Sequence, residues 1–139
     1  MAKPHPTYNP QSAPNASTWL ALPEAQRIKA VATFHQLSHE PCGNLQAHTA
    51  LHVVVENQLA EGFNPAVRAL QRLRGGGLSR HEAVHAVAAV LAEHLYAAMS
   101  GDGPAPDPVA LQEALRGIWM CCPLQVGGPN TARHSAWPC

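Results

Sequence analysis

Two histidine-bearing stretches between residues 44 and 100 decide the fold: His48-Thr-Ala-Leu-His52-Val-Val-Val-Glu56 and His81-Glu-Ala-Val-His85. Residues four apart in an α-helix lie about 40° apart around the axis and one turn apart along it. His48, His52 and Glu56 therefore project from one face of a helix, and His81 and His85 project from one face of another. Two such faces turned toward each other predict a metal site between packed helices.

Three further side chains extend this set. Glu93 lies about two turns beyond His85 on the same helix and within about 80° of it around the axis. His35 lies on an earlier helix and can add a ligand, while His94 can act as a partner that orients a ligand. The predicted metal ligands are His35, His48, His52, Glu56, His81, His85 and Glu93.

Capping residues indicate where the helices begin and end. Asn44 and Ser79 are residue types that cap helix N-termini, and Glu82, three residues after Ser79, completes a capping box. Gly62 and Gly101 are placed to end helices. The expected helices span residues 23–40, 45–61, 65–74, 80–99 and 108–119. No segment has a strand pattern, so the expected fold class is all-α, a compact bundle of about four to five helices with metal ligands on facing helices.

The chain of 139 residues is expected to form one helical domain over residues 17–120. Residues 1–16 are rich in Pro, Asn, Gln and Ser and are expected to form a flexible arm, and residues 121–139 an irregular tail. The sequence has no apolar signal core and no run of roughly 18 apolar residues, which favours a cytoplasmic location. Free thiols are therefore expected at Cys42, Cys121, Cys122 and Cys139.

The charge composition gives no indication of a polyanionic binding partner. Lys+Arg and Asp+Glu number nine each, so nothing in the charge balance indicates nucleic acid or an anionic membrane surface. Nine histidines equal the number of fixed positive charges, and seven of them lie between His35 and His94. A small-molecule substrate or O₂ is the expected partner of a metal site, and a homodimer is compatible with the sequence.

Imidazole and carboxylate donors admit more than one chemistry. Two histidines and one carboxylate with open positions suit a non-haem iron centre that activates O₂, and the same donors hold catalytic zinc. We therefore expect one or two divalent transition-metal ions, with iron favoured over zinc or manganese, and redox or O₂-dependent chemistry on a small substrate. The other interpretations are a non-catalytic metal-binding or structural bundle, and a metal-free core in which His and Glu hydrogen-bond each other.

The second stretch also fits a peptidase motif. His81-Glu82-Ala-Val-His85 matches H-E-x-x-H, in which two histidines bind zinc and the glutamate activates water. Glu82 has a competing role in the capping box, and the sequence offers no edge strand to hold a peptide. A zinc-dependent hydrolase is accordingly the alternative to the redox enzyme.

These segments resemble a family of small bacterial all-helical proteins of unknown function. The resemblance covers about residues 19–100 and rests on two motifs, H-x3-H-x3-E-x-Q beginning at His48 and H-[ED]-x2-H-x7-E-H beginning at His81. It implies a helix-one histidine, matched by His35, and it implies either Glu or Asp at the position of Glu82, which fits a capping role. The resemblance implies no activity.

Overall fold

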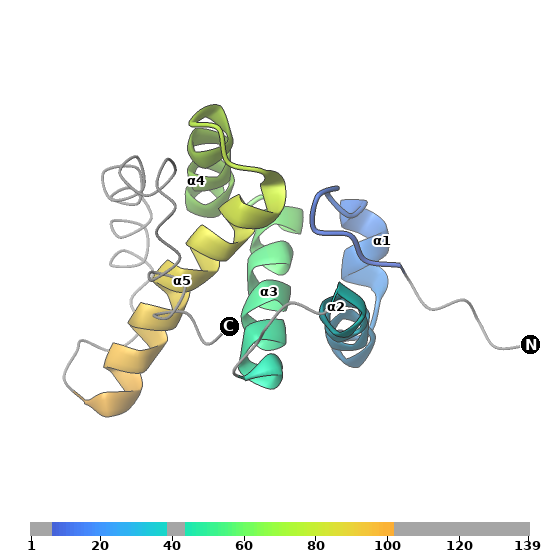
Figure 1. Cartoon of the computed structure of the whole chain (residues 1–139), viewed down its shortest axis with the longest axis horizontal. Helices are drawn as coiled ribbons and strands as arrows, with labels where there is room; N and C mark the ends of the chain where they lie inside the picture. The colour runs from blue at the N-terminus through green and yellow to red at the C-terminus, as the bar shows by residue number, and fades with distance from the viewer. Residues whose placement is uncertain (1–6, 39–43, 102–139) are drawn as a thin grey trace, which may run out of the picture.

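Five α-helices make up the computed structural model in its described part, residues 7–38 and 44–101 (Figure 1). They are α1 (Ala16–Ala21), α2 (Glu24–Ser38), α3 (Leu45–Ala60), α4 (Asn64–Gly75) and α5 (Arg80–Ser100). No strand occurs among these residues. The prediction of an all-α bundle of four to five helices is confirmed.

Helix α3 is the centre of the bundle and contacts each of the other four helices. In Figure 1 it stands between α1 and α2 on one side and α4 and α5 on the other. At 100° per residue, the stripe of His48, His52 and Glu56 points between the directions of Val55 and Val53. The polar stripe of α3 therefore lies between two apolar faces of the same helix.

Each of these apolar faces belongs to a separate hydrophobic cluster. The first joins α3, α4 and α5 through fully buried side chains that include Val55, Leu73 and Val84. The second joins α1, α2, α3 and the segment before α1 through Val53, Val31, Trp19 and Tyr8. Full burial of an aliphatic or aromatic side chain of this size contributes about 1.5–3 kcal/mol. The two clusters fix α2 and α5 on either side of the α3 stripe.

The helix ends follow the predicted capping residues. Asn44 caps α3 by accepting a hydrogen bond from the Ala47 amide at 3.0 Å. Ser79 and Glu82 form the predicted capping box at the start of α5. Gly62 and Gly101 have φ values of 71° and 75°, the left-handed conformation that glycine adopts without strain.

Residues 7–22, the described part of the chain before α2, pack against the other helices. Tyr8 is 5% exposed and Pro10 is also buried. Asn15 caps α1, which the sequence did not indicate, and Trp19 of α1 donates from Nε1 to Asn57 Oδ1 of α3 at 2.9 Å. Large aromatic side chains bury enough apolar area to order a segment whose other residues favour loops.

Several predictions concern residues outside the described ranges. These are the helix at 108–119, the tail at 121–139 and the four cysteines at positions 42, 121, 122 and 139. Among the described helices, none combines the length and apolarity needed to cross a membrane.

Candidate metal centre

Histidines from three helices meet inside the bundle. One ring nitrogen from each of His35 (α2), His48 and His52 (α3) and His85 (α5) lies within 4.8 Å of the others. His48 and His52 are fully buried, His35 is 3% exposed, and His85 is partly exposed. Metal–imidazole bonds of about 2.0–2.1 Å put two nitrogens of one ion roughly 3–4 Å apart. The group is slightly wider than a closed single-ion site, and small side-chain rotations would close it.

A fifth histidine stands at the margin of the group. The ring centroid of His81 is 4.3 Å from that of His85 and 5.5 Å from that of His52. Its ring also meets Phe34 edge-on at 5.7 Å. His81 is therefore placed to bind the same ion or to orient His85.

A backbone carbonyl fixes the tautomer of His35. Its Nδ1 lies 2.9 Å from the carbonyl oxygen of Val31. Because a carbonyl only accepts, Nδ1 donates, and the neutral ring carries its lone pair on Nε2. That Nε2 lies 2.9 Å from Nε2 of His48. Two nitrogens at this distance either share one proton or can bind one ion with bonds at roughly a right angle.

A tyrosine and a carboxylate fix the tautomer of His52. The Tyr8 hydroxyl donates to Glu56 Oε1 at 2.6 Å and lies 3.4 Å from His52 Nδ1. Because the hydroxyl has one proton and a carboxylate only accepts, Nδ1 of His52 is the donor to Tyr8. The lone pair is then on Nε2, which is buried and has no hydrogen-bond partner among the described residues. Leaving such an atom unsatisfied costs about 1–3 kcal/mol, which a bound ion would remove.

Burial keeps the two α3 histidines neutral. The pKa of His48 is lowered to about 4, first by burial and then by the nearby His35 and His81. The pKa of His52 is also lowered, first by burial and then by the neighbouring imidazoles, of which His85 contributes most. Neutral imidazole is the form that binds metal, so both rings are in the binding form at neutral pH.

Glu56 lies beside the histidine group with its charge already balanced. Arg80 donates to both carboxylate oxygens at 2.9 and 2.8 Å, and also to the carbonyl oxygen of Pro10 at 2.9 Å. Burial opposes the charge of Arg80, but the hydrogen bonds and charge of Glu56 outweigh it and raise its pKa. The pKa of Tyr8 is raised by burial and by Glu56, so its hydroxyl stays protonated. Glu56 therefore contacts the histidine group indirectly, through the Tyr8 hydroxyl that lies next to His52.

The remaining predicted ligand lies apart from the group. Glu93 is exposed and follows His85 by eight residues, which is about 12 Å along the axis of α5. Glu82 is likewise exposed, and its Oε2 accepts a hydrogen bond from the Ser79 amide at 2.8 Å. The structure thus brings five of the predicted residues together, sets Glu56 next to them and leaves Glu93 distant. Their roles as ligands stay predictions.

Sequence reasoning did not identify Tyr8 and Arg80 as parts of this site. Tyr8 is in a segment of loop-forming composition, and Arg80 stands between a capping serine and a histidine, where an arginine is ordinarily exposed. The one available signal was the buried Glu56 itself, since a carboxylate on an inward helix face requires a cationic or hydrogen-bonding partner.

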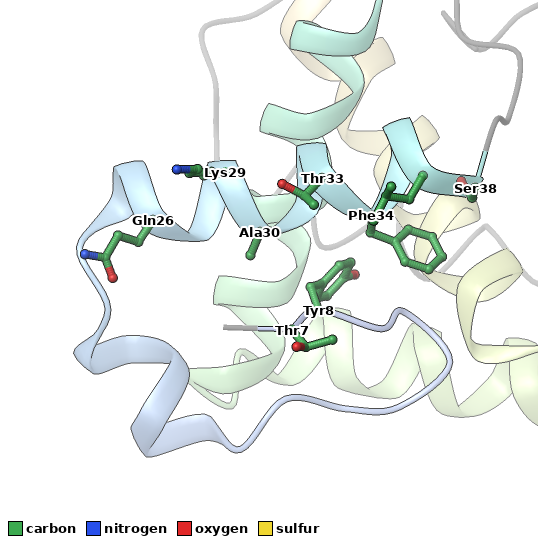
Figure 2. Close-up of a pocket in the computed structure, with 9 residues that line it drawn as sticks. Thr7, Tyr8, Gln26, Lys29, Ala30, Thr33, Phe34 and Ser38 are labelled. Carbon is green, nitrogen blue, oxygen red and sulfur yellow. The ribbon is translucent and has the colours of Figure 1, made fainter. Parts of the chain in front are cut away.

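A pocket of about 440 Å³ lies between α2 and the segment before α1 (Figure 2). Tyr8 and Phe34 are part of its lining. The ring of Phe34 meets that of His35 edge-on at 5.3 Å, and Tyr8 reaches His52. These two aromatic side chains therefore contact both the pocket and the histidine group.

Comparisons with known proteins give no matching family model, no matching curated protein and no matching solved structure. The resemblance of the histidine motifs to a small bacterial family stays an expectation.

Proposed function

We propose that this protein binds one transition-metal ion through His35, His48, His52 and His85. The observation that carries the proposal is the buried Nε2 of His52, a lone pair without a hydrogen-bond partner among the described residues and close to three other imidazoles. A metal ion is the partner that satisfies several imidazole lone pairs at once. His81 can serve as a further ligand or orient His85.

One ion suits the donors better than two. Paired metal sites hold their ions about 3.5–4 Å apart, and helical bundles build such sites largely from carboxylates. Within the described residues Glu56 is paired with Arg80 and Glu93 is distant. The sequence favoured iron because it offered two histidines and one carboxylate as ligands. Imidazole donors alone suit iron, copper, nickel or zinc, so the structure gives no preference for iron over zinc.

We further propose redox or O₂-dependent chemistry on a small molecule at this ion. His48 and His52 are shielded from solvent, while His85 is partly exposed and marks the side from which a small molecule would approach. The hydrolase alternative requires Glu82 to activate a metal-bound water, but Glu82 is exposed and engaged in the capping box. A structural metal site is the second candidate, because four histidines are enough to close a tetrahedral zinc site.

Metal content is the first test. Protein without a histidine tag is analysed by elemental analysis as purified and after reconstitution with iron, zinc, manganese and copper. We expect about one ion per chain for at least one of these metals. A content below about a tenth of an ion per chain in every case refutes metal binding.

Paired alanine variants on one helix test the ligand set. His85→Ala removes a proposed ligand, whereas His94→Ala removes a histidine further along α5 and outside the group. We expect metal affinity to fall at least about tenfold in the first variant and to stay unchanged in the second. Equal affinities contradict the assignment of His85.

O₂ consumption with a reductant supports the redox proposal, whereas an inert metal whose chelation only lowers the melting temperature supports the structural site.

A further inference from the structure

The segment before α1 carries a side chain into the metal centre. The ring of Tyr8 packs against Trp19 and Phe34, with centroid distances of 5.7 and 6.0 Å. This packing brings its hydroxyl to Glu56 and His52, two residues of α3 one turn apart. Tyr8 is therefore the contact between the first described residues of the chain and a proposed ligand.

We propose that Tyr8 is a positioning residue of the metal centre: its hydroxyl, held by Glu56, fixes the ring orientation and tautomer of His52 so that Nε2 faces the ion. The inference rests on the proposed metal site and deepens it. Outer partners of this kind orient imidazole ligands and make them better donors.

Arg80 sets the direction of the hydrogen bonds that lead from Glu56 through Tyr8 to His52. A guanidinium only donates, and here it donates to both oxygens of Glu56, which selects the ionised carboxylate. An ionised carboxylate only accepts, so the Tyr8 hydroxyl donates its single hydrogen bond to Glu56 Oε1 at 2.6 Å. His52 Nδ1 must then donate to the Tyr8 oxygen. In the opposite arrangement Tyr8 would donate to Nδ1, the proton of His52 would sit on Nε2, and that nitrogen would be unable to bind metal.

The same segment is anchored at the start of α5. Arg80 donates to the carbonyl oxygen of Pro10 at 2.9 Å, and the His81 amide donates to Gln11 Oε1 at 3.3 Å. Anchoring at two points limits how far Tyr8 can move from His52. Residues 8–11 thus connect α3 to the start of α5, and this connection helps to keep the proposed ligands of the two helices close together.

Removing one hydroxyl tests the inference. Tyr8→Phe keeps the aromatic packing and loses only the hydrogen bonds, and Tyr96→Phe on the exposed surface of α5 is the matched control, because Tyr96 is 76% exposed. Affinities for Zn²⁺ and Co²⁺ and the visible absorption spectrum of the Co²⁺ protein are measured for both variants. We expect Tyr8→Phe to weaken metal binding by about 10–100-fold and to shift the Co²⁺ bands, and Tyr96→Phe to change neither.

The outcomes separate the two levels of the proposal. If the wild-type protein binds neither Zn²⁺ nor Co²⁺, the metal site itself is wrong. If the wild type and Tyr8→Phe bind with equal affinity and give the same Co²⁺ spectrum, the site stands and the positioning role of Tyr8 is overturned. Should Tyr8→Phe fail to fold, the double variant Glu56→Leu with Arg80→Met replaces it. This variant removes the acceptor that holds the Tyr8 hydroxyl together with the buried charge that pairs with it, and unchanged affinity and spectrum would again overturn the inference.

Discussion

Replacing Arg80 by methionine is expected to destabilise the fold far more than replacing an exposed arginine. The side chains of Arg80 and Glu56 are 4% and 1% exposed, with 2.8 Å between Nη2 and Oε2. Methionine keeps much of the apolar stem but leaves the Glu56 carboxylate buried without its cation. Removing one partner of a buried ion pair costs about 3–5 kcal/mol, because the other charge is left uncompensated.

The surrounding contacts set the expected loss within this range. Arg80→Met removes two hydrogen bonds to Glu56 and one to the carbonyl oxygen of Pro10. The Tyr8 hydroxyl still donates to Oε1, so the carboxylate keeps one partner. We therefore expect the free energy of unfolding to fall by about 3–4 kcal/mol. With a urea m-value of roughly 1.5 kcal/mol/M, the unfolding midpoint falls by about 2 M.

Urea unfolding of the chelator-treated protein, followed by far-UV circular dichroism, measures this loss. Arg68→Met on the exposed side of α4 is the control and should change the free energy of unfolding by less than about 0.5 kcal/mol. The double variant Arg80→Met with Glu56→Gln also removes the buried negative charge and should recover part of the loss. A coupling free energy above about 1.5 kcal/mol is expected from this cycle.

Two results would refute the reasoning. One is a loss below about 1 kcal/mol in Arg80→Met, which would mean that Glu56 is not a buried, paired carboxylate. The other is additivity of the two changes within about 0.5 kcal/mol. Either result would also remove the argument that Arg80 sets the direction of the hydrogen bonds leading to His52.

Three smaller effects on stability are also expected. Metal-free protein should lose stability as the pH falls below about 6.5 toward 4, because the pKa of His48 is about 4 in the fold against 6.5 in the unfolded chain. The unfolded chain binds the extra proton in this range and is therefore favoured. Urea midpoints that stay constant between pH 7 and pH 5 would contradict this. Gly62→Ala should lower the free energy of unfolding by roughly 1 kcal/mol because φ is 71°, although nothing lies within 4 Å of the added methyl group. Gly75→Ala, in the last turn of α4 with similar open space, should leave stability unchanged or raise it, and the urea unfolding assay described above measures both glycine variants.

Short-range patterns predicted α2 to α5 because the signals that end these helices are local. Asn44, Ser79 and the left-handed glycines act within a few residues of the backbone groups that they satisfy. The six-residue α1 was missed because a helix this short is not stable by itself. Its order comes from Trp19, whose ring packs on Tyr8 and bonds Asn57, and neither partner is near it in sequence.

Helical spacing predicted the face that carries His48, His52 and Glu56 but not what each side chain would contact. The partners of Glu56 are 24 and 48 residues away, so only the tertiary structure shows that Arg80 and Tyr8 occupy its carboxylate. Glu93 is a different case. Glu93 lies about 80° from His85 around α5 but about 180° from the buried Val84, so its side chain is on the exposed side of the helix. Two turns of helix also carry it about 12 Å from His85 along the axis.

The surroundings of His52 support the proposed metal ion over a metal-free core of mutually bonded His and Glu. Glu56 cannot satisfy His52 Nε2, because an ionised carboxylate only accepts hydrogen bonds and this nitrogen is itself an acceptor. A proton cannot fill the role on His52 at neutral pH, because burial and the adjacent imidazoles lower the pKa of that ring. A metal ion would accept the lone pair of this nitrogen without requiring the ring to carry charge. Metal present at about 100 times its dissociation constant should then raise the free energy of unfolding by about 2.7 kcal/mol, whereas a core complete without metal would gain nothing.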